Sequence, residues 1–422
     1  MKKLLATILA LVMVLLGLCS VSWAEERVVP VYPDGVNANS FPEAAVYVDD
    51  QGAEKNDKPA LVAYVDQSGD IQYAADLNTA IVKGATVVYC KENATIMCSL
   101  TRGASRTAEM LHDVTIYANN ANFQNTEISI NNTSLSDQSQ GKTKSFTLKV
   151  YDAKNIKIWG DHPAEGAVQN IYMENCHNVG ETRTGNAGIL VMVQGQTETN
   201  TGKLFVEINN CSVEKANTGI YVGGNGSLTV TDSKFGDCAA AIKVSFKGSG
   251  TQETVIKNCE FTACGCNQSD AGNNTWLADD SSAVKIKNSK SGTLTATIDN
   301  ATITGTVGDK GDIQIESKTN PAGVTVRNTA AAVSVTKPGA TDAGVTEVKN
   351  VAKNNTLTIA ADGSAKVEST SSTGGYYYHP TTDTKTDTTK GSPKTFDAGV
   401  GIYAVTAVLS VTGMAWTAKK RH

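Results

Sequence analysis

One phrase of nine residues recurs between Ile171 and Cys264, and it restricts the possible folds more than any other feature of the sequence. In each copy mostly apolar residues alternate with polar ones, then Asn or Asp stands at the fifth place and a small residue at the sixth. Alternation with period two is typical of a strand with one buried face, and Asn or Asp tolerates the backbone of a tight bend. Each copy therefore predicts a strand, a corner and the start of another strand. The four clearest copies are IYMENCHNV from Ile171, VEINNCSVE from Val206, LTVTDSKFG from Leu228 and TVIKNCEFT from Thr254.

The small sixth-place residues recur at a distance that suits stacked coils. They stand at 153, 176, 211, 233, 259 and 301, which gives steps of 23, 35, 22, 26 and 42 residues. Repeats of this length cannot bury their apolar face alone and must stack on neighbours, and the two longer steps predict loops that bulge from the stack. We predict an all-β chain. A β-sandwich is the alternative, but it would normally show hairpin turn pairs, which the sequence lacks.

A helix and a strand precede these repeats. Asp76 is a suitable N-cap, apolar residues follow on one helix face, Gly84 ends the helix, and Thr86 to Tyr89 predict a strand. With the repeats, this order resembles right-handed parallel β-helix domains of the pectate-lyase-like superfamily over residues 70 to 335. The resemblance implies that the helix covers the open end of the first coil. Many members of the superfamily cleave acidic polysaccharides, using calcium held by Asp and Glu or using close-set Asp residues.

The N-terminus has the pattern of a secretory signal peptide. Lys2 and Lys3 precede an apolar run from Leu4 to Leu18, and Ser22-Trp23-Ala24 fits a cleavage site. A retained anchor is the alternative, although the run is shorter than the ~20 residues of a spanning helix. Cys19 could suggest a lipoprotein, but Leu18 before it does not fit the lipidation pattern.

The C-terminus predicts an anchor at the cell surface. The 21 residues from Ala398 to Ala418 carry no charge, and Lys419-Lys420-Arg421 follow, which would keep the tail on the cytoplasmic side. With Pro393 and Thr395 just upstream, the order resembles the cell-wall sorting signal of Gram-positive surface proteins. This resemblance implies that a sortase attacks the Thr395 carbonyl and transfers it to a cell-wall precursor. A plain C-terminal membrane helix is the alternative.

We therefore divide the chain into five segments: a signal peptide (1–24), an N-terminal segment of unassigned role (25–70), a parallel β-helix (71–337), a β-poor flexible spacer (338–391) and a sorting signal with hydrophobic helix and basic tail (392–422). A mature product from Glu25 to Thr395 lacks five of the basic residues and one of the acidic residues, which leaves a formal net charge near −9. This acidity argues against nucleic acid as a partner.

Eight cysteines remain after the signal peptide is removed, and an even number in an exported protein suggests disulfides. However, Cys176, Cys211 and Cys259 occupy the place that Ala or Ser fills in other copies, which favours buried thiols. Bridges remain open for Cys90 with Cys98, and for a pair among Cys238, Cys264 and Cys266. The spacing of Cys264 and Cys266, with few ligands nearby, gives no metal site.

The residues that point outward from the first strand of each copy form the candidate site. We predict glycan binding by Tyr151, Tyr172, Glu174, Glu207 and Asn209, because strands lie about 4.8 Å apart and would bring two carboxylates beside two aromatic rings. Glu174 and Glu207 are also the only, and weak, catalytic candidates. An ordinary solvated sheet face is the simpler interpretation. Asp161, His162 and Glu165 form a second cluster, where the sequence favours a surface histidine.

Two functions remain open. The first is a non-enzymatic, exported surface rod, anchored to cell wall or membrane, that acts as an adhesin or binds a polysaccharide or cell-surface glycan. The second is a polysaccharide lyase or glycoside hydrolase on the same scaffold. The sequence has no lyase or hydrolase signature and implies no cofactor, although a calcium site remains open.

Overall fold

The computed structural model describes residues 29–102, 105–130, 143–194, 201–267, 282–308, 310–339, 347–360 and 363–369. All of them belong to one compact unit that ends at Ser371. The expected signal peptide, sorting signal and hydrophobic C-terminal helix lie outside these residues. In the described ranges, no helix has the length and apolar character needed to cross a membrane.

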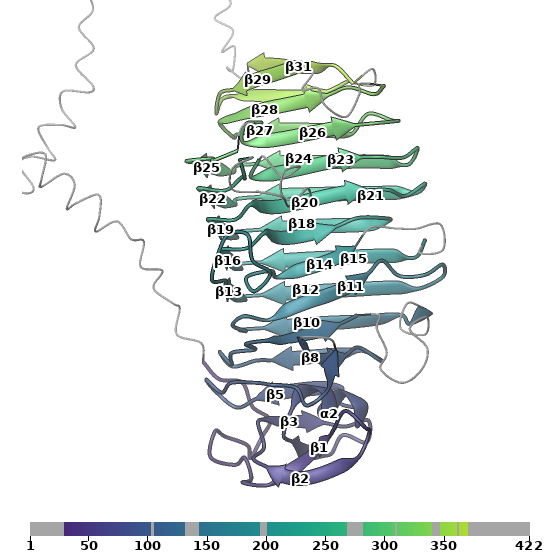
Figure 1. Cartoon of the computed structure of the whole chain (residues 1–422), viewed down its shortest axis with the longest axis vertical. Coiled ribbons are helices and arrows are strands. Elements are labelled where there is room, and N and C mark those ends of the chain that lie inside the picture. The colour runs from purple at the N-terminus through teal and green to yellow at the C-terminus, as the bar shows by residue number, and fades with distance from the viewer. Residues whose placement is uncertain are drawn as a thin grey trace, which may run out of the picture. The chain divides into compact units, whose positions relative to one another are not determined.

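Three sheets run along a stack of coils (Figure 1). The first has 15 strands, the second 11 and the third 5, and the strands of successive coils pair in parallel through most of each sheet. This arrangement is that of a parallel β-helix, as the repeats predict. Its right-handed sense remains a prediction from the general preference of parallel crossovers.

Within each sheet, hydrogen bonds between neighbouring strands set the order. The first sheet contains β2 (Glu54–Lys58), β1 (Ala45–Val48), β4 (Ile71–Ala74), β3 (Val62–Val65), β5 (Val87–Cys90), β8 (Val114–Tyr117), β10 (Phe146–Tyr151), β12 (Val168–Glu174), β15 (Lys203–Asn209), β18 (Gly226–Thr231), β21 (Thr251–Lys257), β24 (Thr293–Asp299), β27 (Gly323–Arg327), β30 (Asn355–Ile359) and β31 (Ala365–Ser369). The second contains β29 (Glu347–Val351), β28 (Ala331–Thr336), β26 (Ile313–Ser317), β23 (Val284–Asn288), β20 (Ala240–Phe246), β17 (Thr218–Val222), β14 (Val191–Gln194), β11 (Lys157–Asp161), β9 (Thr126–Ser129), β7 (Ser105–Glu109) and β6 (Thr101–Arg102). The third contains β13 (His177–Val179), β16 (Ser212–Glu214), β19 (Lys234–Gly236), β22 (Glu260–Thr262) and β25 (Thr302–Thr304).

The corner after each of seven successive strands of the first sheet, from β10 to β27, has a left-handed backbone, as its Asn or Asp predicts. Seven such residues have φ between 48° and 58°: Asp152, Asn175, Asn210, Asp232, Asn258, Asn300 and Asn328. Asn and Asp adopt this conformation more readily than other residues with a Cβ atom. Their amides also hydrogen-bond between coils: Asn258 Nδ2 donates to Asp232 at 2.9 Å, and Asn300 Nδ2 donates to Asn258 at 2.9 Å.

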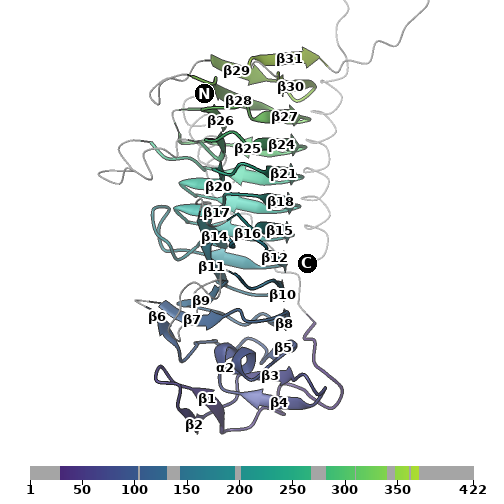
Figure 2. The same ribbon diagram turned by 90° about the vertical axis from the view of Figure 1, so that its right-hand side faces the viewer.

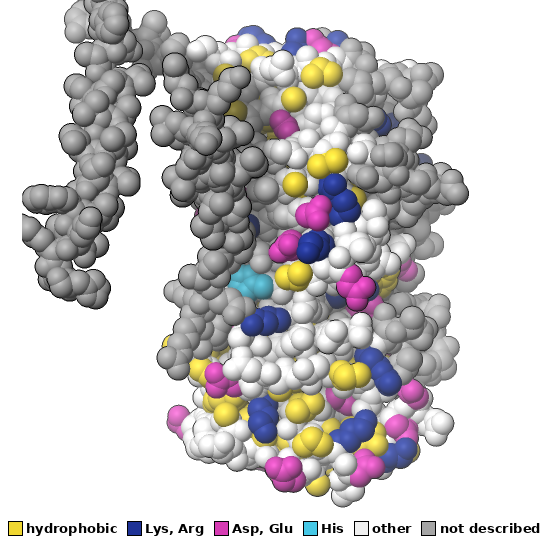
Figure 3. Space-filling view, turned by 60° about the vertical axis from the view of Figure 1, so that its left-hand side comes forward, with side chains coloured by type: hydrophobic (Ala, Val, Ile, Leu, Met, Phe, Trp, Pro, Cys, Tyr) yellow, Lys and Arg dark blue, Asp and Glu magenta, His cyan; other side chains and the backbone are white. Residues whose placement is uncertain are grey.

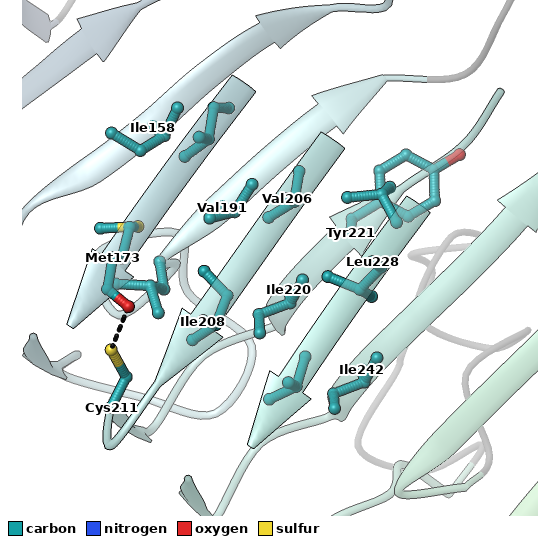
Figure 4. Packing of buried hydrophobic residues seen from close by; sticks show 14 of the residues in the cluster. Ile158, Met173, Val191, Val206, Ile208, Cys211, Ile220, Tyr221, Leu228 and Ile242 are labelled. Carbon is teal, nitrogen blue, oxygen red and sulfur yellow. Dashed lines mark hydrogen bonds between the residues drawn. The ribbon is translucent and has the colours of Figure 1, made fainter. Parts of the chain in front are cut away.

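The alternate residues that the sequence assigns to the interior are buried. Val206, Ile208, Leu228 and Val230 are at most 2% exposed and belong to one continuous core. Figure 4 shows how residues of β12, β15 and β18 face those of β11, β14, β17 and β20 across the coil. Thr254, which interrupts the apolar pattern, also points inward and is 1% exposed.

The eight cysteines from Cys90 to Cys266 are free thiols, and all are buried. This confirms the interpretation of the sixth place as a small buried site rather than a disulfide position. Burial raises the pKa of the Cys259 thiol to about 12. The proposed bridges between Cys90 and Cys98 and within the group of Cys238, Cys264 and Cys266 are not formed in the structure.

The sheets extend beyond the predicted β-helix at both ends. Helix α2 (Leu77–Val82) has Asp76 as N-cap and packs against β1, β3, β4 and β7, and β1 to β4 continue the first sheet (Figure 2). At the other end, β29, β30 and β31 pair antiparallel to the coil strands or to one another. They lie within residues 338–391, which the sequence predicts to be poor in strands. This part of the predicted spacer therefore belongs to the sheets, because short alternating runs such as Thr356 to Ile359 can pair with the last coil.

Candidate functional site

A row of four tyrosines lines the outer face of the first sheet. Tyr89, Tyr117 and Tyr151 occupy matching positions on β5, β8 and β10, and Tyr172 follows on β12. The inward neighbours Val88, Ile116, Val150 and Met173 are fully buried, so the pleat directs the tyrosines outward. All four rings are half-buried. We call these four residues the tyrosine row.

The rings of the tyrosine row contact one another in sequence. Tyr89 and Tyr117 stack with centroids 5.4 Å apart and planes 14° apart, and Tyr117 and Tyr151 stack at 5.2 Å and 15°. Tyr172 breaks the stack, because its ring is tilted by 52° at 5.6 Å from Tyr151. The stacked rings direct their faces at each other and offer edges and hydroxyls to solvent. Within the described ranges, the hydroxyls of Tyr89, Tyr117 and Tyr151 form no hydrogen bond to the protein.

Glu174 is held at the end of this row. Its carboxylate accepts a hydrogen bond of 2.6 Å from the Tyr172 hydroxyl and one of 3.4 Å from the Asn209 amide. Asn209 in turn accepts from the Thr231 hydroxyl at 2.9 Å. The bond to Glu174, together with burial, raises the pKa of the Tyr172 hydroxyl. Glu174 is therefore positioned as a hydrogen-bond acceptor at the surface of the sheet.

The two candidate carboxylates are neighbours but are not directly opposite. In the register of β12 with β15, Tyr172 lies opposite Glu207, and Glu174 lies opposite Asn209. Glu174 and Glu207 are thus diagonal partners, whose Cα atoms lie roughly 7 to 8 Å apart in a sheet of ordinary geometry. Glu207 is exposed and makes no hydrogen bond or ion pair with another described residue. It is a solvated carboxylate beside an aromatic ring.

The structure brings the five predicted binding residues together and adds three that the sequence pattern did not reveal. Tyr151, Tyr172, Glu174, Glu207 and Asn209 share the outer face of β10, β12 and β15. Tyr89 and Tyr117 extend the row by two strands, and Phe205, which is 37% exposed, flanks it on β15. The sequence does contain a signal for Phe205. It stands two places before Glu207, so the alternation of inward and outward residues, extended towards the N-terminus of the strand, places it on the same outer face.

The second predicted cluster does not form a surface site. His162 is 1% exposed, its Nε2 donates to the Gly202 carbonyl oxygen at 3.0 Å, and its Nδ1 is buried without a partner among the described residues. The ring fits because Gly224 lies beside it: a Cβ atom there would be 2.6 Å from Cε1 and Nδ1. Burial lowers the pKa of His162 to about 4. The interpretation of His162 as a surface histidine is therefore wrong.

The face formed by the third sheet shows no comparable group of aromatic and acidic side chains among the described residues. Figure 3, which turns the side of the third sheet toward the viewer, shows acidic and basic side chains interspersed without a large area of one charge. Lys234 and Glu260, on neighbouring strands of that sheet, form an ion pair at 3.5 Å. In the described ranges, no three His, Cys, Asp or Glu side chains are grouped as metal ligands.

Comparison with known proteins adds no assignment. No family model, no curated protein and no solved structure matches the chain. The function must therefore be inferred from the outer face of the first sheet.

Proposed function

We propose that this chain is a non-enzymatic β-helical rod of the cell surface that acts as an adhesin or glycan-binding module. Its ligand is an extended polysaccharide, from the envelope or from a host or neighbouring cell surface. The chain of the ligand runs along the coils over the tyrosine row, Glu174, Glu207 and Asn209. The finer resemblance to the pectate-lyase-like superfamily, many of whose members cleave acidic polysaccharides on such scaffolds, is part of this proposal.

The tyrosine row is the observation that supports it best. Three hydroxyls that have no partner among the described residues are spaced by one coil each, with ring centroids 5.2 to 5.4 Å apart. They offer hydrogen bonds at a spacing close to the length of one sugar unit in an extended chain. Glu174 and Asn209 continue the polar contacts on the next two strands. Aromatic side chains with polar tips supply both apolar contact and hydrogen bonds, which suits sugars.

A glycan array and two product assays test the proposal. The full-length chain is applied to an array of extended polysaccharides, and the binders are then incubated with it and assayed for reducing sugars and unsaturated products. We expect binding without turnover. Turnover that disappears in Glu174→Gln would overturn the non-enzymatic function and favour a lyase or hydrolase. No binding to any polysaccharide would overturn the glycan module.

Anchoring is a separate part of the proposal, and it rests on the sequence of residues 392–422, which lie outside the described residues. We propose export, removal of residues 1–24 and attachment through Thr395 by a sortase to a cell-wall precursor. Cell-wall fractions should contain the protein covalently bound, and Thr395→Ala should abolish this. Complete release of the wild type by detergent would instead support a plain membrane helix.

A further inference from the structure

Three carboxylates lie near Tyr172, on the strands and the corner around it. Glu207 lies directly opposite Tyr172 on β15, and Glu174 accepts the hydrogen bond of its hydroxyl. Asp152, at the corner after Tyr151, adds a third carboxylate and accepts from the Asn175 amide at 2.6 Å. Lys149 is exposed and lies as directly opposite Tyr172 on β10 as Glu207 does on β15, so a basic residue borders the other side of the ring. Lys203 is also on β15 but stands four residues from Glu207, roughly 13 Å along the strand.

Tyr172 ends the row of stacked rings. Its ring is tilted from that of Tyr151, and the residue opposite it on the following strand is Glu207 rather than another aromatic residue. An ammonium group is attracted both to the face of an aromatic ring and to a carboxylate beside it. A uronate group between Tyr172 and Glu207, on the side of the ring away from Lys149, would instead meet a carboxylate of its own charge.

We propose that the polysaccharide bound on this face carries free amino groups, as an unacetylated hexosamine chain does. One ammonium group lies between the Tyr172 ring and the Glu207 carboxylate, and the sugar hydroxyls on either side contact Tyr151 and Asn209. This inference rests on the proposed glycan-binding function and names the chemical class of its ligand. Charge complementarity selects an amino sugar over the uronic acids.

The test compares three probes on the full-length chain by titration calorimetry: a β-linked glucosamine oligosaccharide, its N-acetylated counterpart and an oligogalacturonate. Glu207→Gln removes the charge next to Tyr172 and keeps the shape of the side chain. Glu253→Gln is the matched control, because Glu253 is an exposed carboxylate on β21 of the same sheet face. Measurements at mildly acidic pH keep the amino groups protonated, and a salt series separates charge from other contacts.

We expect the glucosamine chain to bind roughly tenfold or more tightly than the other two, and Glu207→Gln to lose most of this difference while Glu253→Gln retains it. Added salt should reduce the preference. Equal or tighter binding of the N-acetylated chain or of the oligogalacturonate, unaffected by Glu207→Gln, would overturn the inference and leave the glycan-binding function standing. Failure of all three probes, together with an array without binders, would overturn both.

Discussion

At the scale of single residues, the small side chain after a corner forms hydrogen bonds with the backbone at Ser233 and Cys211, in addition to filling a small volume. Ser233 Oγ donates to the Thr231 carbonyl oxygen at 2.7 Å and accepts from the Cys211 backbone N–H at 3.1 Å. Cys211 Sγ repeats this one coil earlier, where it donates to the Asn209 carbonyl oxygen at 3.2 Å and accepts from the Cys176 N–H at 3.4 Å. A thiol or hydroxyl thus pairs a backbone amide that would otherwise be buried without a partner.

Ser233→Ala should therefore destabilise the protein although it is nearly isosteric. The Cys211 N–H would lose its acceptor in the core, which costs about 1 to 3 kcal/mol in the free energy of unfolding. Urea denaturation measures this difference. Ser227→Ala, on the outer face of β18, is the control and should change the free energy by less than about 0.5 kcal/mol. Equal stability of Ser233→Ala and the wild type would contradict the role of this hydrogen bond.

His162 should make the stability depend on pH. Its pKa is lowered from 6.5 to about 4 in the folded state, so between these values the unfolded chain binds a proton that the folded chain does not. Stability is then greatest above pH 6.5 and falls as the pH decreases towards 4, by about 3 kcal/mol in total. Unfolding free energies of the wild type and His162→Gln, measured over this range, should differ in slope. The same slope in both proteins would exclude His162 as the cause.

At the scale of the structural element, the backbone conformation and the side chain of a corner residue make separate contributions to the free energy of unfolding. Asn258 has φ of 55° and shares hydrogen bonds with Asp232 and Asn300, which are exposed. A left-handed residue with a Cβ atom costs roughly 1 to 2 kcal/mol, whereas exposed hydrogen bonds contribute less.

Asn258→Ala should accordingly be less stable than Asn258→Gly by about 1 kcal/mol, because glycine keeps the left-handed backbone at little cost. Both substitutions remove the amide, so their difference reports the backbone alone. Thermal and urea unfolding provide the comparison. If the two variants are equally stable, the contribution of Asn258 to stability comes from the hydrogen bonds between the corner side chains and not from its left-handed backbone.

At this scale, the sequence predicted the features that depend only on residues within one coil. The corner at Asp232, the small site at Ser233 and the buried Leu228 and Val230 follow from alternation and turn chemistry within nine residues. The full tyrosine row could not be predicted in this way, because Tyr89 and Tyr117 lie in the first coils, where the repeat is only loosely recognisable. The burial of His162 also depends on Gly202 and Gly224, which are distant in the sequence.

At the scale of the whole described unit, the first sheet has an exposed edge at its N-terminal end. Its edge strand β2 is exposed along its whole length and consists of charged and polar residues, Glu54 to Lys58. Unpaired backbone groups at an edge can pair with another chain, and charges oppose this association.

Replacing Lys55 and Asp57 together by Val should therefore increase self-association, because the edge then gains apolar residues of high strand propensity. Analytical ultracentrifugation should detect dimers or larger species at concentrations where the wild type sediments as a smaller species. The control, Thr229→Val with Thr297→Val, adds the same side chains to β18 and β24, whose edges are already paired. Equal association of the two double variants would contradict the role of the edge charges.

The most direct test of glycan binding along the tyrosine row is the affinity of the Tyr151→Ala variant for the polysaccharide that the wild type binds most tightly on the array. Thr297→Ala is the control, because Thr297 lies on the outer face of the same sheet, five strands further on and away from the proposed binding residues. We predict that calorimetry will show binding to Tyr151→Ala weakened roughly tenfold or more, and binding to Thr297→Ala changed much less. Wild-type affinity in Tyr151→Ala would contradict glycan binding by the tyrosine row.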